Sequence, residues 1–296
     1  NISNYKRNFT ETAVTSDFFD ATYFSNKAGR YDSSSFQRIT QTVQLRMLEN
    51  PLRKFTFGKR AYLENEIVAA MHPVYDGKRK YNYSNLFVGG EIYNRSNRFL
   101  WWSATARFVL LGRNLGDAIL KGTLHKPLYI FGDTLALHVE GWYQDISPDI
   151  FQEHWQDNHF KWENKFDKQH EVVFKGRADW DKIHFHAGAN YAMMSNFLYN
   201  CKDAKPTQYS GAFSVLGIWL SKEFVLGPIR WNNKFFWQKS TSNVAVHLPM
   251  LNCYSSISVN GILFKVMKYQ IGSEVYYNSS FYADNYEPST SSFYIQ

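Results

Sequence analysis

The chain has 296 residues, of which 18% are aromatic and 20% are charged; this is enough for two average domains or one large all-β barrel. The composition excludes intrinsic disorder, a coiled coil and collagen. Lys and Arg outnumber Asp and Glu by 33 to 26, but the basic residues are scattered, so we expect no nucleic-acid partner. No stretch of about 20 apolar residues could form a membrane-spanning helix.

Residues 1–34 are rich in Ser, Thr, Asp and Asn and predict an irregular loop, with at most one poorly marked strand. From there on, apolar and polar side chains alternate with a period of two, the pattern of a half-buried β-strand. In residues 38–47, for example, Ile39, Val43 and Leu45 share one face, while Arg, Thr and Gln occupy the other. The pattern predicts twelve strands, near 36–48, 55–70, 85–94, 99–111, 117–124, 128–145, 159–179, 183–198, 209–221, 229–238, 253–265 and 268–282.

The predicted connections alternate between short and long. Tight links are expected at 49–51, 94–97, 125–127, 179–182, 226–228 and 265–268, and longer polar excursions at 71–84, 145–158, 199–208, 239–252 and from 283 onward. Only the link at 112–116 is short out of turn. Antiparallel strands joined by short turns at one end and by long loops at the other are typical of outer-membrane barrels.

Alternation by itself is shared by a membrane barrel and a soluble β-sandwich. Small residues such as Gly90, Ala104 and Ala106 interrupt the apolar rows, where a sandwich core would place larger side chains. Several predicted strands also approach the ~9–11 residues that cross a bilayer. We therefore predict an all-β fold, an antiparallel up-and-down transmembrane β-barrel of at least twelve strands, with residues 1–296 forming a single domain.

The final stretch carries the most specific local pattern. Residues 269–277 read Y-x-I-G-x-x-V-x-Y, and residues 281–296 read F-Y-A-x-x-Y-x-P-x-T-x-x-F-Y-x-Q. Both resemble the Putative porin family of Bacteroidetes outer membranes. The resemblance implies an outer-membrane β-barrel whose substrate is unassigned. Members of that family are longer and continue with further strands, so we expect a chain that is incomplete at one or both ends and a closed barrel of ~14 to 18 strands.

The polar positions of the predicted strands are candidates for lining a lumen. They are Arg38, Arg46, Arg107, Lys121, His138, Glu140, His184, His186, Arg230, Lys234 and Glu274. Counted with Lys175, Arg177, Glu64, Glu66, Glu91, Asp117 and Asp179, the inward charges are eight positive against seven negative. Such a balance predicts no strong selectivity for anions or cations, because rings of one sign bias a pore.

Aromatic residues near the strand ends are candidates for the girdles that sit at the two lipid headgroup levels. The predicted girdle residues are Trp102, Trp162, Trp180, Trp231, Trp237 and Tyr277.

Catalytic and metal-binding motifs are absent from the sequence. His184 and His186 share one strand face and could hold a metal, but no third ligand has a recognisable spacing, so two polar residues in a wet lumen are the favoured interpretation. Cys201 and Cys253 form neither a disulfide framework nor a CxxC pair. We expect no enzymatic activity, no metal and no cofactor.

The leading functional prediction is a channel in the bacterial outer membrane for passive diffusion of small solutes. The first alternative is a non-conducting barrel that serves as an accessory subunit of a larger outer-membrane assembly. The second is a soluble all-β carbohydrate-binding protein, since aromatic rings stack on sugars. Expected partners are outer-membrane lipid, lipopolysaccharide and other outer-membrane proteins.

Overall fold

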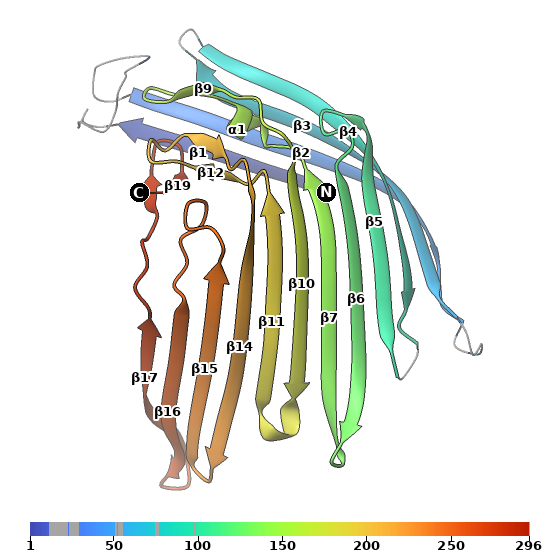
Figure 1. Cartoon of the computed structure of the whole chain (residues 1–296), viewed down its shortest axis with the longest axis vertical. Coiled ribbons are helices and arrows are strands. Elements are labelled where there is room, and N and C mark those ends of the chain that lie inside the picture. Colours follow the sequence, from blue (N-terminus) through green and yellow to red (C-terminus); the bar gives the residue numbers. More distant parts are fainter. Residues whose placement is uncertain are drawn as a thin grey trace.

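A computed structural model describes residues 1–11, 23, 30–50, 52, 56–74, 77–96 and 99–295. Its main element is one antiparallel sheet of thirteen strands in the order β1-β2-β3-β4-β5-β6-β7-β10-β11-β14-β15-β16-β17 (Figure 1). The strands are β1 Ile2–Glu11, β2 Arg30–Met47, β3 Gly58–Val74, β4 Gly77–Asn94, β5 Trp101–Gly112, β6 Ala118–Ile130, β7 Asp133–Ile146, β10 Gln169–Trp180, β11 Phe185–Ser195, β14 Ala212–Leu226, β15 Ile229–Ser240, β16 Leu251–Leu263 and β17 Met267–Asn278.

Every strand pairs with its neighbour in sequence within this sheet, so the sheet is an up-and-down meander with β1 at one edge and β17 at the other. The turns after β6, β10, β14 and β16 lie at one end of the strands, which we call the short-turn end. The segments after β7, β11, β15 and β17 lie at the opposite, long-loop end. Both edge strands run from the short-turn end to the long-loop end. This arrangement confirms the predicted all-β, antiparallel, up-and-down architecture.

The register shows why the alternating pattern forms a sheet with two different faces. Val43 pairs with Leu63 and Leu63 with Val88, so apolar side chains line up across strands on one face. One residue away, Thr42 pairs with Glu64, and polar side chains line up on the other face. We call these the apolar face and the polar face. A register slip of one residue would exchange them, so this pattern specifies the pairing strongly.

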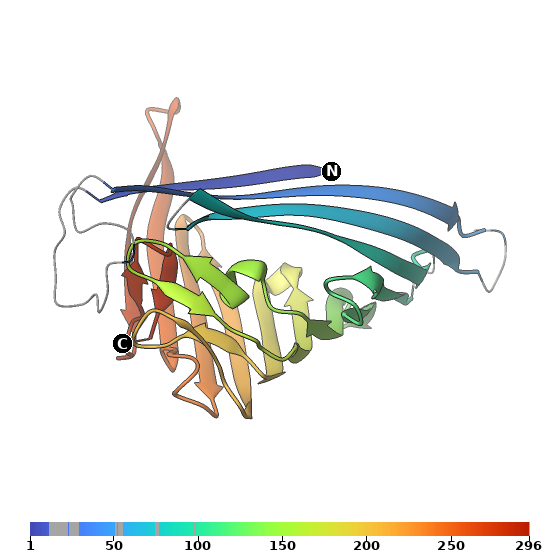
Figure 2. The same ribbon diagram turned by 90° about the horizontal axis from the view of Figure 1, so that it is seen from above.

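Viewed onto the long-loop end, the sheet forms an open curve (Figure 2). Residues 147–168, which we call the cap, lie on its inner side; they contain α1 (Ile150–Glu153), β8 (His154–Gln156) and β9 (Lys161–Glu163). The cap contacts side chains of the polar face: Phe151 meets Phe36 of β2 at 6.4 Å between ring centroids, and Trp155 meets His72 of β3 at 6.0 Å. The polar face is therefore the inner, concave face of the curve.

One cluster of buried apolar side chains lies at the long-loop end rather than between two sheets. Trp155, Phe160 and Ala204 form this core, with Trp162 and Tyr294 packed against it. On the apolar face of the sheet, by contrast, Leu45 is 80% exposed and Val43 is 76% exposed. The rows of apolar side chains do not pack against a second layer within the described residues, as they would in a soluble β-sandwich. No helix in the described ranges is long and apolar enough to cross a membrane.

Small elements occupy the remaining connections. They are the 3-10 helix η1 (Asp181–Ile183) and the two-stranded pairs β12 (Leu198–Asn200) with β13 (Pro206–Gln208) and β18 (Asn285–Glu287) with β19 (Ser292–Tyr294). The helix α1 begins with a capping box, in which the Asp149 carboxylate accepts from Phe151 N and the Gln152 side chain accepts from Asp149 N.

Four predictions about strands and their connections differ from the structure. The N-terminal segment contains the full strand β1 and the start of β2, whereas residues 12–22 and 24–29 of the predicted loop lie outside the described residues. The 71–84 excursion is mostly strand, because β3 and β4 continue as a ribbon to Val74 and from Gly77. The predicted strand 159–179 is divided, and β10 begins only at Gln169.

The fourth difference is the turn predicted at 125–127. The hairpin of β6 and β7 continues past Pro127, which pairs with Ala136, and turns at Phe131 and Gly132 instead. Pairing of β5 with β6 ends at His125, so among the described strands residues 126–130 of β6 pair with β7 alone. A proline is tolerated there because a strand with one free side has no ladder on that side to interrupt.

Candidate functional site

The polar face is the candidate functional surface. On β2 to β5 its charges form cross-strand ion pairs: Arg38 lies 3.2 Å from Glu66, and Arg60 lies 3.3 Å from Glu91. Arg107 pairs with Glu64 and also stacks over the Phe87 ring, at 3.7 Å from its centroid. Each of these three glutamates is thus bound by an arginine, and Glu91 is bound by Arg95 as well, at 3.1 Å.

The register places ten of the eleven predicted lumen residues on the polar face. They are Arg38, Arg46, Arg107, Lys121, His138, Glu140, His186, Arg230, Lys234 and Glu274. The structure brings Lys121 and Glu140 together, with 2.6 Å between Nζ and Oε1. Glu274 instead accepts a hydrogen bond from the Tyr254 hydroxyl at 3.0 Å.

His184 is the exception. It follows η1 in a left-handed conformation with φ of 50° and precedes β11, so it belongs to a turn at the short-turn end and not to the strand face. Its Nδ1 lies 3.7 Å from Glu223, whereas His186 Nδ1 lies 2.8 Å from Asp179. The expectation that His184 and His186 share one strand face is therefore wrong, because the tight turn ends the alternation before Phe185.

A histidine and aspartate cluster lies toward the short-turn end of the polar face on β6, β7, β10 and β11. His125 and His138 share a hydrogen bond of 2.9 Å between their Nδ1 atoms, which requires one ring to donate and the other to accept. The Asp179 carboxylate lies 2.7 Å from Arg177 Nε, 2.8 Å from His186 Nδ1 and 3.4 Å from His138 Nε2. No group of three or more His, Cys, Asp or Glu suited to a metal ion occurs among the residues that the structure describes.

Sequence reasoning missed His125 because it assigned that residue to a turn. The available signal was the alternation of side chains along β6, which continues through Thr123 and His125 and past Pro127.

Two adjoining cavities open on this part of the polar face. One, of about 520 Å³, is lined by Trp101, His125, Lys175 and other residues of β5 to β14. The other, of about 860 Å³, is lined by His186, Lys234 and other residues of β7 to β17. They share His138, Arg177 and Trp219, so the two cavities form one continuous lined surface.

Glycines let aromatic rings lie flat against the polar face. Trp219 pairs directly with Gly188, and a Cβ at Gly188 would lie 2.7 Å from the indole Nε1. The Tyr62 ring likewise covers its cross-strand partner Gly89, where a Cβ would overlap the ring. The rings therefore cover the wall instead of projecting into the space that it encloses.

The predicted girdle residues separate into two levels. Trp102, Trp180 and Trp231 lie at the short-turn end of the sheet, and Trp237 and Tyr277 lie toward the long-loop end. Trp231 Nε1 donates to Ser255 Oγ at 2.9 Å, and Trp180 Nε1 donates to Asp133 Oδ2 at 2.7 Å.

Trp162 does not belong to a girdle. It lies in β9 of the cap, where its indole stacks on Trp155 at 6.0 Å and donates to Phe151 O at 2.9 Å. The reason is that the chain leaves the sheet after β7 and returns only at Gln169, so Trp162 packs into the core at the long-loop end.

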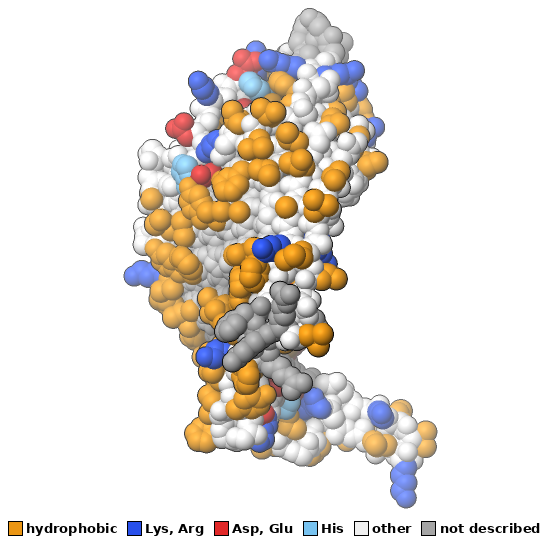
Figure 3. All heavy atoms as spheres, turned by 90° about the vertical axis from the view of Figure 1, so that its right-hand side faces the viewer, with side chains coloured by type: hydrophobic (Ala, Val, Ile, Leu, Met, Phe, Trp, Pro, Cys, Tyr) orange, Lys and Arg blue, Asp and Glu red, His pale blue; other side chains and the backbone are white. Residues whose placement is uncertain are grey.

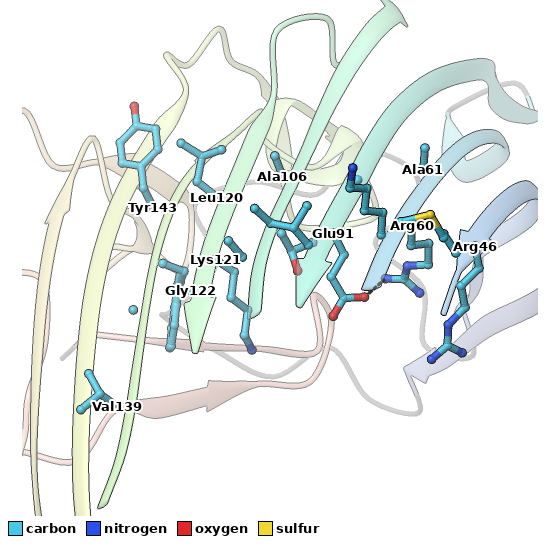
Figure 4. A pocket seen from close by; sticks show the side chains of 18 of the residues that line it. Arg46, Arg60, Ala61, Glu91, Ala106, Leu120, Lys121, Gly122, Val139 and Tyr143 are labelled. Carbon is cyan, nitrogen blue, oxygen red and sulfur yellow. Dashed lines mark ion pairs between the residues drawn. The ribbon is translucent and has the colours of Figure 1, made fainter. Parts of the chain in front are cut away.

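Hydrophobic side chains extend over the middle of the side of the molecule seen in Figure 3, where charged side chains are sparse. The apolar face contains a hollow of about 1080 Å³ with a floor of small residues, including Ala61, Gly90 and Gly122. Figure 4 shows that Leu120, Ala106 and Tyr143 point to one side of the sheet here, while Lys121, Glu91 and Arg46 point to the other. The wall thus separates an apolar surface from a charged one by a single layer of backbone.

The cap is anchored by polar contacts as well as by its aromatic core. Arg113 binds Glu153 at 2.5 Å, and Arg79 of the β3–β4 ribbon binds Glu163 at 2.7 Å. The Asp157 side chain is buried and accepts hydrogen bonds from Trp155 Nε1 at 2.9 Å and from the backbone N of His159 and Phe160 at 2.8 and 2.6 Å. Burial raises the pKa of Asp157 to about 6, in spite of these donors.

This pKa predicts that the cap is less stable at neutral than at acidic pH. Because the folded-state pKa of Asp157, about 6, lies above its ordinary value of 3.8, the folded form holds more protons in this interval. The stability contributed by this group is therefore fully present at the acidic end and falls as the pH rises through the folded-state pKa. After correction for intrinsic exchange rates, the amides of residues 154–163 should be more strongly protected from hydrogen exchange at pH 5 than at pH 7.5.

Asp157→Asn is the matched variant for this prediction. It should remove the pH dependence, while lowering protection overall because the Asn amide faces the Trp155 indole donor. A wild-type cap whose exchange, corrected for intrinsic rates, is the same at both pH values would contradict the assignment.

A family model described as Putative porin matches residues 1–296. The chain belongs to the Putative porin family. A crystal structure of the siderophore receptor PirA from Pseudomonas aeruginosa is similar to this porin-family chain, with a TM-score of 0.59 and 11% identity. The similarity covers 84% of this chain and 48% of the receptor, so the chain spans about half the receptor's length. No curated protein sequence gives a significant match.

At this identity the similarity to the receptor shows the fold alone, which is a β-barrel wall. The family points to the outer membrane and to a transport-related protein.

Proposed function

We propose that this porin-family chain forms the wall of a bacterial outer-membrane channel for passive diffusion of small solutes. The observation that carries the proposal is the sidedness of the meander: its outer face exposes apolar side chains, and its inner face carries ion pairs, histidines and lysines. Lipid tails on one side and water on the other satisfy these two surfaces, as they do in porins. Catalytic chemistry has no part in this proposal.

Outer-membrane lipid and lipopolysaccharide are the partners that we propose for the outer surface. The apolar face would contact acyl chains, and the aromatic residues at its two levels would lie among the headgroups. The exposed residues Lys78, Arg79 and Lys80 belong to the ribbon at the long-loop end. By register, Lys78 and Lys80 lie on the side of the apolar face and would face lipopolysaccharide phosphates, whereas Arg79 lies on the other side and binds Glu163 of the cap. A Bacteroidetes origin fits the sequence resemblance at the C-terminal end.

One observation favours the second candidate, a non-conducting barrel in a larger assembly. The cap crosses from β7 to the polar face of β2, β3 and β4, and so lies on the inner side of the wall at the long-loop end. A cap in that position can obstruct a lumen, in which case the long-loop end would serve as a contact surface for other outer-membrane proteins.

Planar-bilayer recordings on the purified, full-length protein distinguish these two candidates. Stepwise conductance supports the channel, and its absence from protein that is folded by heat-modifiable gel mobility rules the channel out. A variant in which residues 147–168 are replaced by a short Gly-Ser link tests the cap. Conductance that appears only in this variant would identify an occluded barrel, and equal conductance in both would show that the cap leaves the lumen open.

A further inference from the structure

The acidic groups on the polar face of β6 to β17 are already occupied. Glu140 is bound by Lys121 at 2.6 Å, and Glu223 lies 3.5 Å from Arg230. Asp179 holds three cationic or titratable partners, and Glu274 accepts from a tyrosine hydroxyl. The polar face carries almost equal numbers of positive and negative side chains, but these do not all form pairs. The carboxylates bind only some of the cationic side chains, and within the described part of the chain the other cations have no carboxylate partner.

The two lysines that line the cavities described above remain outside this pairing. Among the described residues, no ion pair involves Lys175 of β10 or Lys234 of β15. Both are exposed, and each ammonium lies over an aromatic ring: Lys175 over Trp142 at 4.6 Å and Lys234 over Tyr254 at 5.6 Å. One lysine lines each of the two cavities described above. An ammonium without a carboxylate is a site for an anion from solution.

Trp219 connects the two lysine sites. It lines both cavities, and Gly188 beneath it holds its indole flat against the wall. A flat indole on a wet surface is a platform on which a ring stacks. Amide and hydroxyl groups surround it, from Asn190 in one cavity and from Ser221 and Asn252 in the other.

We propose that this surface binds an acidic oligosaccharide, with a sugar ring stacked on Trp219 and carboxylates on Lys175 and Lys234. The ligand carboxylates would pair with the two ammonium groups, and the sugar hydroxyls would form hydrogen bonds with the asparagine amides and the serine hydroxyl. An aromatic carboxylic acid could also stack on Trp219, but it has no hydroxyl groups for these amides and the serine. The strand spacing and the register put the two lysines within roughly 20 Å of each other, so a chain of sugar units bridges them and a single unit does not. The proposal names a substrate class and rests on the channel function above.

Calorimetric titration of the detergent-purified, full-length protein with an oligogalacturonate tests the site directly. The neutral galacto-oligosaccharide of the same length is the matched ligand and should bind much more weakly. Lys175→Gln and Lys234→Gln should each weaken oligogalacturonate binding by about tenfold, the loss expected for one charge-assisted contact. Lys182→Gln makes the same charge change in the η1 turn and should leave binding unchanged. Heat-modifiable mobility verifies that each variant is folded.

Equal affinity for the acidic and neutral oligosaccharides, or binding that neither wall lysine affects, would overturn the proposal. Conductance measured on the same preparations separates this outcome from failure of the channel function. A protein that conducts but does not bind oligogalacturonate refutes the site and keeps the channel. A protein that binds it through both lysines but never conducts keeps the site and refutes the channel, and the surface then serves as a receptor.

Discussion

Leu220→Arg is expected to destabilise the folded protein in lipid by about 2–4 kcal/mol, the cost of a cation on the lipid face near the bilayer midplane. Leu220 lies on the apolar face of β14, between Ala187 of β11 and Phe235 of β15, and is 39% exposed. The measurement is reversible denaturant unfolding in vesicles, followed by the shift in gel mobility.

The neighbouring residue supplies the control. Ser221 lies on the polar face of the same strand, opposite His186 and Lys234. Ser221→Arg adds the same side chain one position away and should cost much less, because water solvates it there. If both substitutions destabilised the protein equally, the apolar face would not be in contact with lipid, and the channel proposal would lose its basis.

Arg7→Met is expected to release the C-terminal segment from the wall. Arg7 of β1 is only 8% exposed. Its guanidinium donates to Ser291 Oγ at 2.6 Å, to Pro288 O at 2.9 Å and to Ser289 O. Removing the guanidinium leaves these neutral acceptors without a donor, at a cost of about 1–3 kcal/mol for each one that stays buried. Limited proteolysis should then cut residues 285–295, while the barrel wall keeps its heat-modifiable mobility.

Arg79→Met is the companion variant. Arg79 also reaches across the long-loop end, to Glu163, but both side chains are largely exposed, and exposed ion pairs contribute little. Proteolysis at residues 285–295 should be unchanged in this variant. A C-terminal segment that stays protected without Arg7 would show that the apolar core around Tyr294 holds it instead.

The alternating pattern predicted twelve of the thirteen sheet strands. Each of those strands has one side on the apolar face and one on the polar face, so apolar and polar side chains alternate along it. The exception is β1, in which polar residues occupy both faces: Asn4 and Lys6 on one, Ser3 and Arg7 on the other. Only its pairing with β2 identifies β1 as a strand, and pairing between distant segments is not visible in local composition.

The sequence predicts on which face of the sheet a residue of the candidate site lies, but not which other residues it contacts. Alternation is enough to put Lys234 and Arg107 on the polar side, but the meeting of His138, Asp179 and His186 depends on the register of three strands. Trp162 shows the converse limit. An aromatic residue beside a polar loop fits a headgroup girdle and a packed core equally well, and only the departure of the cap from the sheet decides between them.

The number of strands in the meander constrains how this wall can close. With thirteen strands in the described part of the chain, β1 and β17 point in the same direction, so joining them to each other would create a parallel pair. A ring that stays antiparallel throughout needs an odd number of additional strands between those two edges. A second copy inserted with the same orientation cannot provide the antiparallel neighbour, since both of its edges run the same way as β1 and β17.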